Sequence, residues 1–341
     1  MGMTILSGGF LTTVQDAGRT GFQQFGVPVS GVMDPRSFAI ANILVGNDKD
    51  EAVLEITMMG PAVVFEEANI IAVTGGNLSP ALNGSPLPMY RAVLVKPGDK
   101  LTFGMQVSGC RSYLGVAGGF DIAPVMGSRS TYLKAQIGGV DGRKLGKDDR
   151  LAFRAPKTEL PNLAQGRFVQ PEDFTATHKT LRVVIGPQDD AFTEKGIKTF
   201  LSATYSVTNQ FDRMGCRLEG DIIEHIKGGD IISDGISMGA VQVPSAGQPI
   251  IMLADRQTTG GYTKIANVIT ADFPLIAQCK FGDTVRFKSV TVTEAQDIYL
   301  SNLRRLDAIR TDLDLVQAAP GPWEFTVNVN GSDYRCRVTQ R

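Results

Sequence analysis

The residues most able to do chemistry are concentrated between residues 228 and 264. In this stretch the apolar run PIIMLAD indicates a buried strand that ends on Asp255, and RQTTGGYTK follows it directly. Successive backbone amides in a glycine turn form an anion-binding concavity. Two hydroxyls and Lys264 can complete a cradle for a carboxylate or a phosphate, and the alternative is a hairpin with a solvated rim. Beside Asp255 and Lys264, the candidate groups are Thr258, Thr259, Gly260 and Gly261.

Two cationic candidates precede this stretch. Arg213 and Arg217 lie four residues apart in VTNQFDRMGCRLEG. On a helix they would share a face, but Gly215 between them favours a loop or a strand. We take both arginines and Ser30 as candidate substrate-binding residues, with ordinary surface charge as the alternative for the arginines. Glu55, within an apolar strand, is either a buried, paired carboxylate or part of an exposed face.

Several common catalytic and cofactor motifs are missing. The chain has no GxxxxGK[ST] phosphate loop and no GxGxxG between a strand and a helix. The four cysteines are far apart and there are only two histidines, so we predict no metal site. Cys216 is better explained as a small buried residue than as a nucleophile.

Charge and hydropathy argue against several classes of partner. The 34 basic and 35 acidic residues give a formal net charge of -1, which creates no general field for nucleic acid or an anionic membrane. No segment approaches the roughly 20 apolar residues of a membrane span, and the first residues do not resemble a secretion signal. We expect a cytoplasmic protein that binds neither nucleic acid nor membrane.

The elements that must position the candidate residues are mostly short strands. Short apolar runs separated by Gly, Pro, Asn and Asp recur in both halves of the chain. This pattern is typical of closed or nearly closed antiparallel barrels. The phrase KPGDKLTF at residues 96–103 returns as KFGDTVRF at 280–287 and more loosely as GKDDRLAF at 146–153. The repetition indicates either a duplicated barrel or the same turn chemistry used again.

Few helices are expected. One should begin at Pro35 with Asp34 as its cap. A longer one should follow the strands, with Thr293 as its cap, and lead to a hairpin that turns at Asn330 and Gly331.

We therefore predict a mainly β fold in four segments. A first barrel domain spans residues 1–155, and a proline-containing linker spans 156–179. A second barrel domain spans 180–290, and a C-terminal helix and hairpin at 291–341 pack back on a barrel.

Long phrases in a fixed order connect the chain to a known family. They are SGVMDPRSFAIAN, EITMMGP, VTGGN, YLGVAGGF, GSRSTY, IGGVDGRKL, GPQDDAF, DRMGCRLEG, ISDGISMGAVQVPSAGQPIIMLADRQTTGGYTKIANVI and ADFPLIAQ. From about Ile5 to Phe287 the chain resembles the KipA-type family, also called allophanate hydrolase subunit 2-like or biotin-dependent carboxyltransferase-type. The resemblance implies two tandem cyclophilin-like β-barrel domains.

The resemblance also implies an activity. It points to one of the subunits of an ATP-dependent 5-oxoprolinase complex, which opens 5-oxoproline to L-glutamate and hydrolyses ATP to ADP and phosphate. The implied partners are two further proteins of the complex, one of the KipI type and one of the LamB/YcsF type. ATP is bound in the complex, and this chain is expected to be inactive alone. A lactam is a stabilised amide, so phosphorylation of its oxygen would make the ring carbon electrophilic enough for water.

The same resemblance implies only part of the site. In carboxyltransferase relatives a phrase similar to LADRQTTGG lies at the substrate pocket, which implies that Asp255 and the glycines after it are site residues. We expect Asp255 to orient the lactam, and the charges of Lys264, Arg213 and Arg217 to stabilise phosphoryl or carboxylate groups. The chain lacks the biotin-attachment tripeptide Met-Lys-Met, so we expect no biotin on it.

Two alternative functions stay open. The family name comes from a protein that antagonises a KipI-type kinase inhibitor, which suggests a regulatory partner-binding role. A similar module in urea carboxylase transfers a carboxyl group to urea, and that reaction would require a separate biotin carrier.

Overall fold

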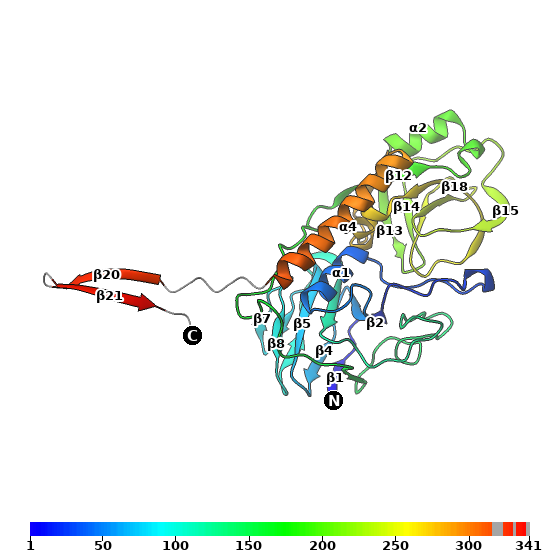
Figure 1. Ribbon diagram of the computed structural model, residues 1–341. Helices are drawn as coiled ribbons and strands as arrows, with labels where there is room; N and C mark the ends of the chain where they lie inside the picture. The colour runs from blue at the N-terminus through cyan, green and yellow to red at the C-terminus, as the bar shows by residue number, and fades with distance from the viewer. Residues whose placement is uncertain (316–322, 330–331, 339–341) are drawn as a thin grey trace.

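Strands dominate the computed structural model, which describes residues 1–315, 323–329 and 332–338. Figure 1 shows two β-rich regions side by side, with helix α4 (Val292–Asp314) running along both. The predicted mainly β fold with few helices is confirmed.

The first region contains two antiparallel sheets. Its strands are β1 Gly2–Ser7, β2 Leu11–Gln15, β3 Val53–Thr57, β4 Ala62–Phe65, β5 Asn69–Asn77, β6 Ala81–Leu82, β7 Ser85–Pro86, β8 Val93–Val95, β9 Lys100–Thr102, β10 Ser108–Val116 and β11 Arg150–Ala152. One sheet has the order β11-β1-β4-β9-β6-β7 and the other the order β2-β3-β10-β5-β8. Ile5 and Phe65 from the first sheet and Leu114 from the second lie in one buried cluster, so the two sheets share a core.

Helix α1 (Pro35–Leu44) begins as predicted. Asp34 Oδ1 accepts hydrogen bonds from the amides of Arg36 at 3.1 Å and Ser37 at 2.9 Å, and a proline fills the first helical turn. The helix packs on β5 and β10. It therefore holds the segment that carries Ser30 close to this sheet.

The second region is a ring of strands. They are β12 His178–Ile185, β13 Tyr205–Phe211, β14 Gly215–Glu219, β15 Asp230–Gly235, β16 Ala240–Val243, β17 Ile250–Met252, β18 Thr259–Val268 and β19 Thr284–Ser289. The order is β12-β19-β13-β14-β17-β16-β18-β15, and β12 also pairs with β18. The hydrogen-bonded order thus returns to its first strand, while β15 pairs with the first half of β18 outside the ring.

The repeated phrases form the same turn three times. In each turn an aspartate carboxylate accepts a hydrogen bond from the amide three residues before it, and the residue directly before the aspartate has a positive φ. Asp99 accepts from Lys96 at 2.8 Å, Asp149 from Gly146 at 2.7 Å, and Asp283 from Lys280 at 3.1 Å. The positive φ values are 89° at Gly98, 68° at Asp148 and 88° at Gly282. Two of these turns lie in the first region and one in the second, so the same turn chemistry recurs both within one region and between the two.

Gln278, which follows α3 (Phe273–Ala277), fastens the two regions together. Its Oε1 accepts hydrogen bonds from the amides of Cys110 and Arg111, both at 2.9 Å, and its Nε2 donates to Asp34 Oδ2 at 3.0 Å. Gln278 is 1% exposed, so every polar atom of its amide is satisfied inside the protein.

Helix α4 has its cap at Thr291, and the predicted cap at Thr293 is wrong. Thr291 Oγ1 accepts a hydrogen bond from the amide of Glu294 at 3.2 Å, and Glu294 Oε2 accepts one from the amide of Thr291 at 2.7 Å. The other end of α4 is held by fully buried Arg167, which pairs with Asp314 at 2.8 Å. The predicted linker therefore packs on the fold and supports this helix.

The remaining elements are shorter. They are α2 Glu194–Ser202, the 3-10 helices η1 Gln23–Phe25, η2 Asp189–Ala191 and η3 Thr270–Asp272, and the paired strands β20 Trp323–Val329 and β21 Ser332–Val338. The predicted turn at Asn330 and Gly331 lies outside the described residues. Figure 1 draws the β20–β21 hairpin away from the rest of the chain, and its packing on a barrel stays a prediction.

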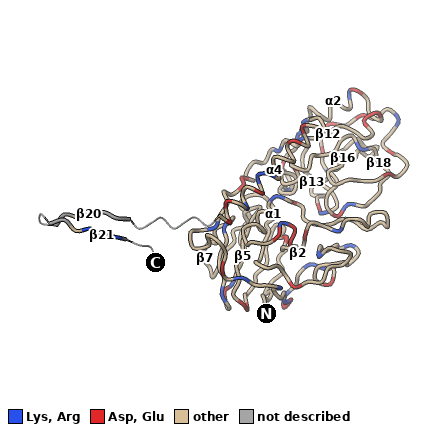
Figure 2. Tube along the Cα trace, in the orientation of Figure 1, with Lys and Arg blue, Asp and Glu red and all other residues tan. Residues whose placement is uncertain are grey.

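Charges of both signs are intermixed along the trace in Figure 2, as expected from the net charge of -1. Within the described part of the chain, no helix has the length and apolar character that crossing a membrane requires.

Candidate functional site

Arg213 and Asp255 meet in a buried ion cluster between the two β-rich regions. Arg213 Nε donates to Asp255 Oδ2 at 2.9 Å, and Arg213 Nη2 donates to Asp255 Oδ1 at 3.1 Å. Arg213 Nη1 donates to Glu55 on β3, and Nη2 also donates to the carbonyl of Gly31. Because Asp255 follows β17 and Glu55 lies on β3, this guanidinium joins the second region to the first.

The cluster is nearly sealed from solvent. Arg213 is 5% exposed, Asp255 4% and Glu55 1%. Burial lowers the pKa of Arg213, but the carboxylates of Asp255 and Glu55 outweigh it, so the pKa is raised and the guanidinium stays charged. The Tyr113 hydroxyl donates to Glu55 Oε2 at 2.9 Å, and burial, with the Glu55 and Asp34 charges, raises the pKa of Tyr113.

This pairing changes the predicted roles. Arg213 and Asp255 lie together, but Arg213 is engaged by two carboxylates and a carbonyl, so it is not presented to a ligand as expected. Of the two alternatives for Glu55, the buried, paired carboxylate is correct. Ser30 lies beside Gly31, is 4% exposed and has φ of 55°, and its Oγ has no hydrogen-bond partner among the described residues.

The predicted glycine turn at residues 260–261 is wrong, because this segment is a strand. Thr258 precedes β18, and Thr259, Gly260 and Gly261 are its first residues, paired with β15. In extended backbone, successive amides point in opposite directions, so they do not form the concave anion site. Gly260 instead provides space: a Cβ there would lie 2.5 Å from Ile236 Cδ1 and 2.9 Å from Gln242 Nε2.

Lys264 lies farther along β18, in a cavity of about 520 Å³ that Thr258 and Arg256 also line. Lys264 is 3% exposed, and its Nζ donates to Asp234 Oδ2 at 3.1 Å. Arg256 donates to the carbonyls of Ile236 and Leu253, and burial lowers its pKa to about 10. The two predicted site residues Asp255 and Lys264 thus have separate partners: Asp255 pairs with Arg213, and Lys264 pairs with Asp234.

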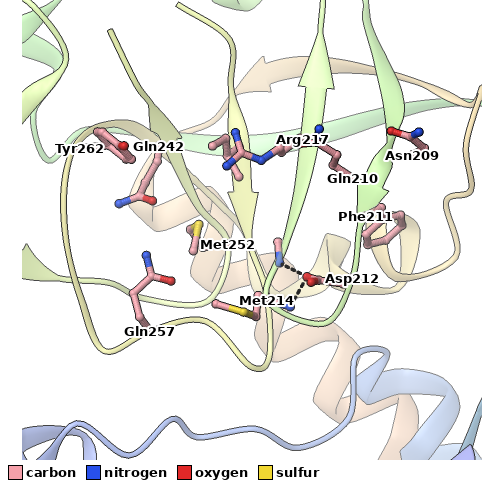
Figure 3. A pocket seen from close by; sticks show the side chains of 12 residues that line it. Asn209, Gln210, Phe211, Asp212, Met214, Arg217, Gln242, Met252, Gln257 and Tyr262 are labelled. Carbon is pink, nitrogen blue, oxygen red and sulfur yellow. Dashed lines mark hydrogen bonds between the residues drawn. The ribbon is translucent and has the colours of Figure 1, made fainter. Parts of the chain in front are cut away.

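Arg217 lines a different cavity, of about 480 Å³, on the face of β14, β17 and β16 that points away from the core (Figure 3). The strand and loop placement predicted for Arg213 and Arg217 is confirmed, since Arg217 lies on β14 and Arg213 precedes it. The cavity floor is apolar and includes Ile250 and Met252. The full lining is Asn209, Gln210, Phe211, Asp212, Met214, Gly215, Arg217, Gln242, Ile250, Met252, Gln257 and Tyr262.

Most polar side chains in this lining are free. Among the residues that the structure describes, hydrogen-bond and ion-pair partners are missing for the side chains of Asn209, Gln210, Arg217, Gln242, Gln257 and Tyr262. Figure 3 shows Arg217, Gln242 and Gln257 arranged around Met252. An apolar floor with a few convergent polar groups is the usual composition of a small-molecule site.

Sequence reasoning does not single out Gln242, Gln257 or Tyr262. Gln242 stands in AVQV, where a polar residue interrupts an apolar strand, and that signal marks it as unusual. Gln257 and Tyr262 carry no such signal, because polar residues near a strand end are ordinary.

Cys216 is fully buried, and burial raises the pKa of its thiol well above the usual value. The interpretation of Cys216 as a small buried residue is confirmed, since the thiolate is the nucleophilic form.

Comparison with known proteins identifies relatives of two kinds. A family model described as carboxyltransferase domain, subdomain A and B, matches residues 25–289. The C subunit of 5-oxoprolinase from Escherichia coli (strain K12) is 38% identical over 293 residues, covering 86% of this chain and 93% of that protein. The urea amidolyase of Saccharomyces cerevisiae is 33% identical over 327 residues, covering 87% of this chain but 18% of that protein.

Solved structures agree with this relationship. The Kluyveromyces lactis urea carboxylase superposes with a TM-score of 0.84 at 29% identity, covering 99% of this chain and 32% of that chain. The K. lactis urea amidolyase gives a TM-score of 0.82 at 31% identity, covering 90% of this chain and 20% of that chain. This chain thus corresponds to nearly all of the 5-oxoprolinase protein and to about a fifth to a third of the urea enzymes. The chain belongs to the family of the carboxyltransferase domain, subdomain A and B.

Proposed function

We propose that this chain is part of an ATP-dependent 5-oxoprolinase complex that converts 5-oxoproline, ATP and water to L-glutamate, ADP and phosphate. One observation carries the proposal: the chain aligns with 93% of the C subunit of Escherichia coli 5-oxoprolinase. The match covers nearly the whole of that subunit, whereas it covers 18% of the urea amidolyase of Saccharomyces cerevisiae.

The proposed complex also contains one protein of the KipI type and one of the LamB/YcsF type, and ATP is bound in the assembly. Transfer of the terminal phosphoryl group of ATP to the lactam oxygen releases ADP. Water then adds to the ring carbon, and cleavage of the ring C–N bond frees the amine and leaves an acyl phosphate. A second water hydrolyses the acyl phosphate to release phosphate and L-glutamate. We place this reaction in the cytoplasm, with no biotin on this chain and no metal held by it.

Within this proposal, Asp255 positions the substrate cavity through its ion pair with Arg213. The pair connects the turn at residues 212–215 with the loop that follows Asp255, and both segments line the cavity in Figure 3. Lys264 and Arg256 offer positive charge in the neighbouring cavity, where they would stabilise a phosphoryl or carboxylate group. Ser30 and residues 258–261 complete the proposed substrate region.

The fold assignment is part of the proposal. We propose tandem cyclophilin-like domains at residues 1–155 and 180–290, joined by a linker at 156–179 and followed by the helix and hairpin at 291–341. The returning strand order of the second region supports a closed barrel there.

The test is reconstitution of the three proteins with an assay of ATP-dependent glutamate release. Omission of this chain should abolish turnover, and addition of the purified chain should restore it. If the KipI-type and LamB/YcsF-type proteins release glutamate at the full rate without this chain, the proposal is wrong.

Carboxyl transfer to urea or another amide is the second candidate, supported by the structural match to urea carboxylase over 99% of this chain. That activity would need bicarbonate and a separate biotin carrier. Carboxylation that depends on a biotin carrier, without glutamate release, would favour this candidate. Tight binding of a KipI-type partner without either turnover would favour the regulatory role.

A further inference from the structure

We propose that the cavity in Figure 3 binds a small planar amide that also carries a carboxylate, with Gln242 binding the amide carbonyl and Arg217 the carboxylate. The inference deepens the proposed function and rests on it where 5-oxoproline is named as the ligand. It moves the substrate contacts away from Asp255, whose carboxylate is already held by Arg213.

Gln242 supplies the first observation. Its side chain is 2% exposed and lines the cavity, yet its Nε2 has no hydrogen-bond partner among the described residues. A buried amide donor without a partner destabilises a protein, and native structures contain few of them. A carbonyl oxygen of a ligand in this cavity would satisfy the donor.

Arg217 supplies the second. Its guanidinium has no acidic partner within the described ranges. The acidic residue in the lining, Asp212, accepts hydrogen bonds at its Oδ1 from the amides of Met214 at 2.7 Å and Gly215 at 3.1 Å, and so serves its own turn. The planar guanidinium of Arg217 is therefore available for a carboxylate, which it can bind through two parallel hydrogen bonds.

Strand register sets the spacing between these two groups. Arg217 on β14 is opposite Ile250 on β17, and Ile250 is opposite Gln242 on β16. Neighbouring strands lie about 4.8 Å apart, so the Arg217 and Gln242 backbones are separated by about 10 Å with Ile250 between them. Ile250 and Met252 line the cavity, so methylene groups of a small ring can pack on them while its two polar ends reach the flanking side chains.

The neighbouring cavity is a weaker candidate for this ligand. Its lysine, Lys264, is already paired with Asp234, and its arginine, Arg256, donates to two backbone carbonyls. The Figure 3 cavity contains the unpaired buried amide of Gln242. It also contains Arg217, a cation without an acidic partner among the described residues.

The experiment measures binding of 5-oxoproline to the complete chain in its reconstituted complex by titration calorimetry, with Gln242→Leu and Arg217→Met compared with the unsubstituted protein. Each substitution should weaken binding about 10- to 100-fold, because each removes a desolvated or charge-assisted hydrogen bond. Arg304→Met, which replaces an exposed arginine on α4, is the matched control and should leave binding unchanged.

The lactam 2-pyrrolidinone, which lacks the carboxylate, separates the two roles. Its binding should be weakened by Gln242→Leu and unaffected by Arg217→Met. Gln242→Leu removes an unpaired buried amide, so the melting temperature of that variant should not fall. Arg217 is exposed, so Arg217→Met should leave folding unchanged and test the site by its effect on binding.

Two outcomes overturn the inference: 5-oxoproline binds both variants as tightly as the unsubstituted protein, or it does not bind the complex at all. In the first case, glutamate release that still requires this chain would leave the proposed reaction intact. Conversely, Gln242-dependent and Arg217-dependent binding without turnover would support the site and contradict the reaction.

Discussion

Arg213 donates to both carboxylate oxygens of Asp255, at 2.9 and 3.1 Å, and so forms a two-point contact at the boundary between the two β-rich regions. The same guanidinium reaches Glu55 of the first region. The Arg213–Asp255 pair therefore links the loop that contains Asp255 to the first β-rich region.

Replacing Asp255 with Ala should lower the free energy of unfolding by about 3–5 kcal/mol, because removal of one partner leaves a buried charge incompletely compensated. Denaturant unfolding monitored by fluorescence measures the loss. Arg143→Met is the control, since the Arg143 side chain is 46% exposed and the loss of its pair with Asp149 should cost less than about 1 kcal/mol. If Asp255→Ala and Arg143→Met lower the free energy of unfolding equally, the buried cluster does not stabilise the fold more than a surface pair does.

Gly260 should be far less tolerant of substitution than its neighbour. Gly260→Ala puts a Cβ against Ile236 and Gln242, and we expect a loss of about 1–3 kcal/mol from overpacking. It should also weaken ligand binding in the adjacent cavity.

Gly261→Ala is the matched control for Gly260→Ala, because the nearest atom to its Cβ is 3.4 Å away. The free energy of unfolding of this variant, measured by thermal denaturation, should change by less than about 0.5 kcal/mol. If Gly260→Ala and Gly261→Ala change the free energy of unfolding equally, contact with Ile236 and Gln242 does not exclude a larger residue at position 260.

Stability should depend on pH through Asp149. The hydrogen bond from Arg143 lowers the pKa of Asp149 below its ordinary value of 3.8. Its contribution is therefore complete above pH 3.8 and is lost as the pH falls through the lowered pKa of the folded state.

Unfolding in urea tests this pH dependence. The difference in stability between the unsubstituted protein and Asp149→Asn should be larger near neutral pH than at about pH 3, below the ordinary pKa of an aspartate. A difference that stays constant across this range would exclude the ionised carboxylate as its source.

Thiol reactivity should differ sharply between cysteines. Cys110, Cys216 and Cys279 are buried, and burial raises the pKa of each thiol. Cys336 is partly exposed. In the native protein a thiol reagent at mildly alkaline pH should label Cys336 first, as peptide mass spectrometry would show, and a Cys336→Ser variant should react only on unfolding.

Several features of this protein could be predicted from the sequence, because they depend on local chemistry. Asp34 and Pro35 predict the start of α1, the Gly-Asp phrases predict the turns at Asp99 and Asp283, and short punctuated strands predict a mainly β fold. Long ordered motifs also indicate the family. These signals are carried by residues a few positions apart, so they can be read without knowing the fold.

Which polar residues have partners depends instead on how the chain packs in three dimensions. Glu55 and Arg213 are 158 residues apart, and their pairing requires contact between the two regions. Arg217 and Gln242 flank one cavity because β14 and β16 both pair with β17, a strand order that periodicity does not specify. A two-residue side-chain period predicts which face a residue occupies, but the neighbours on that face are set by long-range strand pairing.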